Sequence, residues 1–246
     1  MSMIVTSKAI LIRSIDYQES SKIITALTQA HGKIALIAKG VKKPKNKLAG
    51  VIELGNILEV TYYYKSTRNI QTLSEASIIY QSLNFRKDFD RASILYSALE
   101  LISQLVHENE ENTELFLFAF NFIIWLGDVK KTPLSLLAYV QLRLAQIIGV
   151  GLIDETTKTN ETVFLNISSG TIAMAPDTEL AYKLTDKQAL FLKMGLNTKN
   201  VEIFTIGLAN SELKQLIHHL DVYFKYHIDG YKDRRSDKIF EQMIQE

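Results

Sequence analysis

The chain has 246 residues, 47% hydrophobic and 22% charged, a composition typical of a globular protein and not of a disordered one. It contains no cysteine, which excludes disulfide bonds and thiolate metal sites. The net charge of +1 conceals an asymmetry: residues 1–80 hold eleven Lys or Arg against five Asp or Glu, a net charge of +6, so the remainder carries −5. Such a division predicts two modules, the first able to attract a polyanion.

The first 80 residues have the residue pattern of β-strands, with β-branched residues and period-two alternation. Five strands are expected, at residues 8–15, 21–28, 33–39, 56–64 and 70–79. His31-Gly32 reads as a turn between the second and third strands. Five short strands with one long connection predict a small β-barrel.

The long connection belongs to the stretch HGKIALIAKGVKKPKNKLAG, residues 31–50, which holds six lysines and no acid. Lysine neutralises phosphate and releases counterions, and lysines beside a curved sheet with aromatic residues are typical of single-strand-binding barrels. The alternative is a solvated loop that keeps the protein soluble. Tyr62, Tyr63 and Tyr64 follow on the next strand, and the sequence leaves open which of them point outward.

After Leu83 the hydrophobic period becomes that of helices. Helices are expected at residues 88–105, 112–127, 132–149, 185–196, 211–228 and 236–245, the second capped by Asn112 or Thr113. Residues 115–126 are apolar nearly all round, which favours the buried centre of a bundle; an apolar groove for a partner peptide is the alternative. That segment is too short to span a bilayer, and the N-terminus lacks a signal-peptide pattern. We expect a cytoplasmic protein.

Residues 160–175 predict a hairpin with its turn at Ser168–Gly170. The expected organisation is therefore α+β: a barrel domain, residues 1–82, followed by a mostly α-helical domain, residues 83–246, that contains this hairpin.

The run KAILIRSIDYQESSKIITALTQAHGKIALIAKGVKKPKNKLAG, together with LSEAS after the fifth strand, resembles the RecO family of bacterial recombination mediators. LLAYVQLRLAQIIG and YFKYHIDG extend the resemblance more weakly into the second half. The resemblance implies an OB-fold followed by a helical domain, with no enzymatic activity and no cofactor. It also implies a nucleoid-associated protein that binds single- and double-stranded DNA, anneals strands, and acts in DNA repair.

The resemblance further implies cooperation with RecR, and sometimes RecF, in loading RecA onto DNA coated by single-stranded-DNA-binding protein. The DNA-binding residues that it implies in this chain are Lys33, Lys39, Lys42, Lys43 and Lys47; Lys45 and Arg68 join them on charge alone. The acidic C-terminal tail of single-stranded-DNA-binding protein is expected on the helical domain. Its contacts there, chosen by charge, are Arg143, Arg234 and Arg235.

Many members of that family carry a four-cysteine zinc site after the helix that corresponds to residues 133–149. This chain has neither Cys nor His between residues 150 and 176, so its hairpin must be held by burial of apolar side chains. His218, His219 and His227 lack the spacing of helical metal ligands, and no metal site is expected.

Two other classes of function compete with the mediator. One is an adaptor whose basic barrel binds an acidic protein and not DNA. The other is a nuclease, for which the sequence offers no cluster of carboxylates and no metal motif. The basic segment YKDRRSDK near the C-terminus reads as a solvated helix start, or as a second DNA-binding patch.

Overall fold

The computed structural model describes residues 2–157, 162–197 and 201–236. They form two compact units, residues 1–130 and 131–246. The predicted boundary after residue 82 coincides with the passage from strand to helix. As a division between independently folding parts it stays a prediction.

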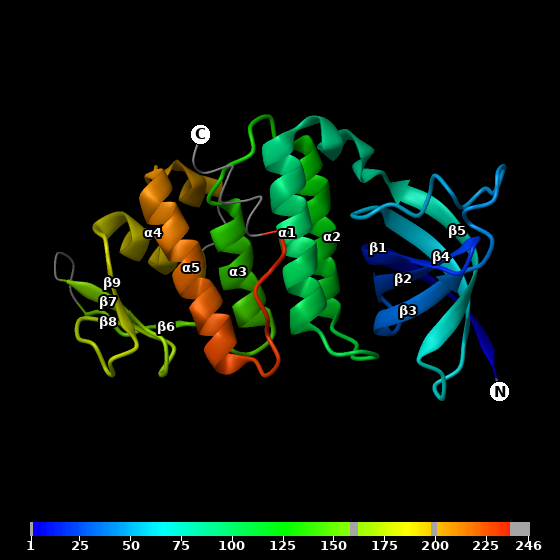
Figure 1. Ribbon diagram of the computed structural model, residues 1–246. Helices are drawn as coiled ribbons and strands as arrows, with labels where there is room; N and C mark the ends of the chain where they lie inside the picture. The colour runs from blue at the N-terminus through cyan, green and yellow to red at the C-terminus, as the bar shows by residue number, and fades with distance from the viewer. Residues whose placement is uncertain (1, 158–161, 198–200, 237–246) are drawn as a thin grey trace. The chain divides into compact units, whose positions relative to one another are not determined.

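The first 80 residues form a closed barrel of order β1-β2-β3-β5-β4 (Figure 1). Four of the five strand pairings are antiparallel and one is parallel. The strands are β1 (Met3–Tyr17), β2 (Ser21–Thr28), β3 (Gly32–Ala38), β4 (Ile57–Tyr64) and β5 (Ile70–Tyr80). β3 and β5 pair in parallel, and this pairing closes the barrel. The predicted five-stranded OB-fold is confirmed.

The barrel interior is filled by the residues that alternate inward along each strand. Ile24, Leu36 and Tyr62 are buried there, together with Leu58 and Val60. The alternate residues of the same strands face outward, and the pairing brings them into one row around the barrel. That row runs through Ile15, Ile23, Ile37, Thr72, Tyr63 and Ile4.

Two helices complete the first unit. A 3₁₀ turn, η1 (Ser82–Lys87), leads into α1 (Phe89–Leu105), which packs against β1, and α2 (Thr113–Asp128) follows. Asp88 caps α1 by accepting a hydrogen bond from the Arg91 amide, and Asn112 caps α2 in the same way through the Leu115 amide. The apolar stripe predicted for α1 is buried, whereas α2 buries one side and leaves Leu117 exposed.

Within its described residues, the second unit consists of three α-helices, a short 3₁₀ turn and a small sheet. The helices are α3 (Leu136–Ile147), α4 (Asp186–Asn197) and α5 (Asn210–His227), with a 3₁₀ turn, η2 (Val201–Thr205), between the last two. The sheet has the order β6-β8-β7-β9, from β6 (Ile153–Asp154), β7 (Val163–Asn166), β8 (Thr171–Ala173) and β9 (Ala181–Leu184). The hairpin predicted near residues 160–175 is therefore the β7–β8 pair, widened by two strands that the sequence analysis missed.

The start of α3 differs from the predicted start, and the last predicted helix is not tested. α3 was expected to begin at Thr132-Pro133, but it begins at Leu136, because residues 133–136 form a turn closed by the Leu136 amide and the Pro133 carbonyl oxygen. The helix predicted for residues 236–245 lies almost wholly outside the described residues. None of the described helices has the length and apolar content that crossing a membrane requires.

Candidate nucleic-acid interface

The six lysines of residues 31–50 lie on β3 and on the connection that follows it. We call residues 39–56, between β3 and β4, the lysine arm. Five lysines of the arm are exposed to solvent, namely Lys39, Lys42, Lys43, Lys45 and Lys47. The arm contains one acid, Glu53, which pairs with Arg86. Its first half therefore carries five lysines and no acid over a short length of chain.

Apolar side chains anchor the lysine arm to the barrel. Val41 and Ile52, near its two ends, are 2% exposed and belong to the barrel core. Leu48 and Val51 pack partly against the same core. Because these anchors are buried, the exposed segment between them is held to the barrel on both sides.

Asn46 fixes the conformation of the lysine-rich part. Its side-chain amide donates to the Gly40 carbonyl oxygen at 2.8 Å, and its side-chain oxygen accepts from the Leu48 amide at 2.8 Å. Pro44 and Lys45 occupy the centre of a turn closed by the Asn46 amide and the Lys43 carbonyl oxygen. Lys45 has φ of +68°, which position i+2 of a type II turn requires and which a side chain disfavours.

The arm is also tied to the turn between β1 and β2. The Lys42 amide donates to the Ser20 carbonyl oxygen at 2.9 Å, and the Lys42 ammonium pairs with the Asp16 carboxylate at 2.8 Å. The hydrogen bond that the Lys42 ammonium donates to the Asp16 carboxylate lowers the pKa of Asp16 below its ordinary value. Asp16 and Lys42 are 26 residues apart, so no local sequence pattern predicts this pair.

Lys33 has a different environment from the arm. Its half-buried ammonium donates to the Ser103 carbonyl oxygen on α1 at 2.9 Å, and burial lowers its pKa. Beside it, Gly32 has φ of +60°, and a Cβ there would meet the Glu110 carbonyl oxygen. Residues His31–Lys33 thus join the barrel to the connection between α1 and α2. A DNA contact by Lys33 stays a prediction, while its place in this junction is a finding.

The three consecutive tyrosines have three different environments. Tyr62 points into the barrel, where burial raises its pKa to about 12, and its hydroxyl lies 2.6 Å from Nδ1 of His31. Tyr64 stacks on the His31 ring, with centroids 3.8 Å apart. Only Tyr63 is substantially exposed among the three, at 42%.

The C-terminal end of the arm and these tyrosines lie toward opposite ends of β4. The arm enters β4 at Ile57 and Tyr63 is six residues further on, about 20 Å along an extended strand. Arg68 lies in the turn that follows, between β4 and β5, at the end of the barrel away from the arm (Figure 1). The structure therefore brings the arm lysines together and separates Arg68 from them.

The arginines predicted to bind a partner tail differ in accessibility. The side chain of Arg234 is fully buried and donates to the Asp221 carboxylate at 2.7 Å. Asp221 also accepts from Gln141 and Tyr231, so Arg234 closes a buried polar network. Arg143 is half-buried and donates to Gln146 of its own helix, and Arg235 is exposed. Partner binding by the three stays a prediction, and for Arg234 it would require opening this network.

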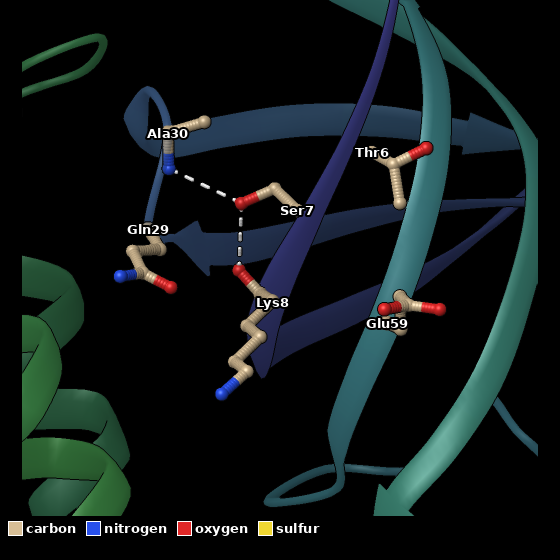
Figure 2. Close-up of a pocket in the computed structure, with 6 residues that line it drawn as sticks. All are labelled: Thr6, Ser7, Lys8, Gln29, Ala30 and Glu59. Carbon is tan, nitrogen blue, oxygen red and sulfur yellow. Dashed lines mark hydrogen bonds between the residues drawn. The ribbon is translucent and has the colours of Figure 1, made fainter.

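A shallow hollow of about 340 Å³ lies elsewhere on the barrel (Figure 2). Its lining residues are Thr6, Ser7, Lys8, Gln29, Ala30 and Glu59. The Ser7 hydroxyl accepts from the Ala30 amide and donates to the Lys8 carbonyl oxygen, so it serves the backbone. The Lys8 ammonium lies over the Phe120 ring, 5.6 Å from its centroid. These contacts connect β1 with the β2–β3 turn and α2, and they do not form a reactive site.

Comparison with known proteins gives one consistent result. Residues 1–82 match the family model for the N-terminal part of recombination protein O, and residues 86–237 match the model for its C-terminal part. A DNA repair protein RecO from Chloroherpeton thalassium is 29% identical over 98% of this chain and 100% of its own length. The proteins of that name from Salinibacter ruber and Chlorobium limicola are 31% and 33% identical. The alignment with the Salinibacter ruber protein covers 76% of this chain and 74% of that protein. The alignment with the Chlorobium limicola protein covers 60% of this chain and 56% of that protein.

These matches agree with the closed barrel of order β1-β2-β3-β5-β4 and with the helical part that follows it. Together they span nearly the whole chain, including the lysine arm. The chain belongs to the RecO family.

Proposed function

We propose that the protein is a non-enzymatic DNA-binding mediator of DNA repair that anneals complementary strands. In this proposal it acts with RecR, and in some settings with RecF, to load RecA onto DNA coated by single-stranded-DNA-binding protein. Membership of the RecO family and the names of its relatives support the repair role. The observation that supports DNA binding most directly is the anchored lysine arm.

The mechanism we propose is electrostatic. Two complementary strands repel each other through their phosphates, and lysines that neutralise phosphates reduce this repulsion and release counterions. An arm held by Val41, Ile52 and Asn46 loses little conformational freedom on binding, so more of the electrostatic free energy contributes to affinity. DNA binding by Lys33, Lys39 and Arg68 is part of the proposal, with the arm as its centre.

The partner contacts in the proposal involve the second unit. A tail that mixes acidic and apolar residues needs cations beside apolar surface. Arg143 and Arg235 offer accessible cations, and α5 exposes Tyr226 nearby in sequence. We expect the protein to work in the cytoplasm, at the nucleoid.

The test is anisotropy of a labelled single-stranded oligonucleotide over a salt series. The variant Lys43→Ala/Lys45→Ala/Lys47→Ala leaves the Lys42–Asp16 pair in place. Each phosphate contact contributes roughly 0.7 to the log–log salt slope, so the slope should fall by up to about 2 units.

The matched control is Lys183→Ala/Lys187→Ala/Lys214→Ala, which removes three exposed lysines of the second unit and changes net charge equally. The control should keep the wild-type slope. An equal slope for both variants and wild type would place the DNA site elsewhere. Failure of the wild type to bind at low salt would favour the adaptor with an acidic protein partner.

A further inference from the structure

We infer that Tyr17 contacts the bases of a single strand whose phosphates lie on the lysine arm, and that this contact strengthens binding to unpaired DNA and not to duplex DNA. This inference rests on the proposed DNA binding by the arm. It assigns a role to a residue outside the lysine cluster and outside the tyrosine run of β4.

The backbone places Tyr17 beside the root of the arm. Tyr17 is the last residue of β1 and pairs in register with Ser21, the first residue of β2. The Ser21 hydroxyl accepts from the Gly40 amide at 3.4 Å, and the Ser20 carbonyl oxygen accepts from the Lys42 amide. Asp16, next to Tyr17, holds the Lys42 ammonium. The start of the arm is thus joined by three separate contacts to the segment that runs from the end of β1 to the start of β2.

The side chain of Tyr17 lies on the outside of the barrel. It follows Arg13 and Ile15 at alternate positions of β1, and all three are exposed. Tyr17 is 39% exposed, whereas the inward-facing tyrosine, Tyr62, is fully buried. A ring exposed to this extent leaves part of its surface accessible to a ligand.

Of the aromatic residues on the barrel strands, which are all described, Tyr17 and Tyr63 are the two exposed by more than a third. Tyr63 lies about 20 Å along β4 from the point where the arm ends. Tyr64 is already stacked on His31. Tyr17 is therefore the exposed aromatic side chain of the barrel strands whose neighbours in sequence, Asp16 and Ser20, bond to the arm.

An aromatic ring beside lysines distinguishes single strands from duplexes for a physical reason. Lysines bind the phosphates of either form, because they read charge alone. A ring can stack only on a base that has left its pair, and such stacking contributes about 1–3 kcal/mol per base. Removing the ring should weaken single-strand binding and leave duplex binding and the number of phosphate contacts unchanged.

The experiment compares Tyr17 variants by anisotropy, with labelled oligothymidylate and with a duplex of matched length. Tyr17→Ala should weaken single-strand binding by about 5- to 100-fold, with the wild-type salt slope and with duplex affinity within about two-fold. Tyr17→Phe and Tyr17→Trp should retain single-strand affinity, because each keeps a ring. Tyr17→Leu should lose it, although it keeps apolar bulk and the barrel fold.

Tyr63→Ala is the matched control, since it removes an equally exposed tyrosine whose strand neighbours lie on β1 and β5 and not in the turn that binds the arm, and it should leave both affinities unchanged. Wild-type single-strand affinity in Tyr17→Ala, or full affinity in Tyr17→Leu, would overturn the inference. Equal weakening toward single strand and duplex would also overturn it. If the three-lysine variant still lowers the salt slope, these outcomes overturn the role of Tyr17 and leave the proposed DNA binding by the arm intact. The proposed function itself fails if the wild-type protein does not bind DNA.

Discussion

The side-chain amide of Asn46 donates to the carbonyl oxygen of Gly40 at 2.8 Å and so closes the part of the arm that carries Lys42, Lys43 and Lys45. Its side-chain oxygen accepts from the Leu48 amide, which joins the same segment to an apolar anchor. One side chain thus holds three lysines in a fixed relation without contributing charge. Because Asn46 is uncharged, its substitution changes the conformation of the arm without changing the charge of the arm. The effects of conformation and of charge on DNA binding can therefore be measured separately.

Asn46→Ala should weaken DNA binding by about 3- to 10-fold, because a looser arm must be ordered again on binding. The salt slope should stay at the wild-type value, since all lysines remain. Anisotropy over a salt series measures both quantities. Asn69→Ala, in the exposed turn at the other end of the barrel, is the control and should bind as wild type. A lowered slope in Asn46→Ala would mean that its lysines no longer reach the DNA.

Lys45→Gly should stabilise the fold and weaken DNA binding. Glycine adopts the φ of +68° found at Lys45 without steric cost, which should raise the free energy of unfolding by about 0.5–1 kcal/mol. Loss of the ammonium should lower the salt slope by about 0.7. Urea unfolding and anisotropy measure the two effects. The control variant is Lys43→Gly, because Lys43 does not have a positive φ. It loses the same charge as Lys45→Gly, but its free energy of unfolding should fall and not rise.

Arg234→Ala should destabilise the second unit by about 2–4 kcal/mol, because it leaves the Asp221 carboxylate without its buried cation. Arg235→Ala, at the neighbouring exposed position, should change stability by less than about 0.5 kcal/mol. Urea unfolding of both variants provides the measurement. Similar stability of the two variants would contradict the buried Arg234–Asp221 pair.

His219 should make the second unit sensitive to acid. Burial, aided by the nearby His218, lowers the pKa of His219 from 6.5 to about 4, and its ring stacks on Tyr182. The neutral ring is favoured in the folded state, so its stabilisation is complete above pH 6.5 and is lost as the pH falls from there toward 4. Between pH 7 and pH 5 the loss should be about 1–2 kcal/mol.

The measurement is urea unfolding at the two pH values. His219→Phe keeps a ring against Tyr182 and should remove most of the difference between pH 7 and pH 5. His218→Ala, at an exposed position, should retain most of it. An unchanged pH dependence in His219→Phe would assign the acid sensitivity to other groups.

Much of the first unit could be predicted because its strands show a simple alternation. Ile24 and Leu36 face the core while Ile23 and Ile37 face outward, and a period of two encodes this directly. The lysine cluster was equally visible, since charge is a property of composition. The four-stranded sheet of the second unit was missed in part because β6 has two residues and β9 has four, too few to display a period.

The sequence by itself determined the barrel, the helical stripes and the concentration of lysines between residues 33 and 47. Only the tertiary structure decided that Lys33 joins a helix, that Arg234 is buried, and that the β1–β2 turn beside Tyr17 bonds to the arm. The physical reason is that these roles depend on partners distant in sequence: Ser103 for Lys33, Asp221 for Arg234, and Gly40 and Lys42 for the β1–β2 turn. Local residue patterns specify which elements form, whereas closure of the barrel and packing of the helices decide which side chains meet.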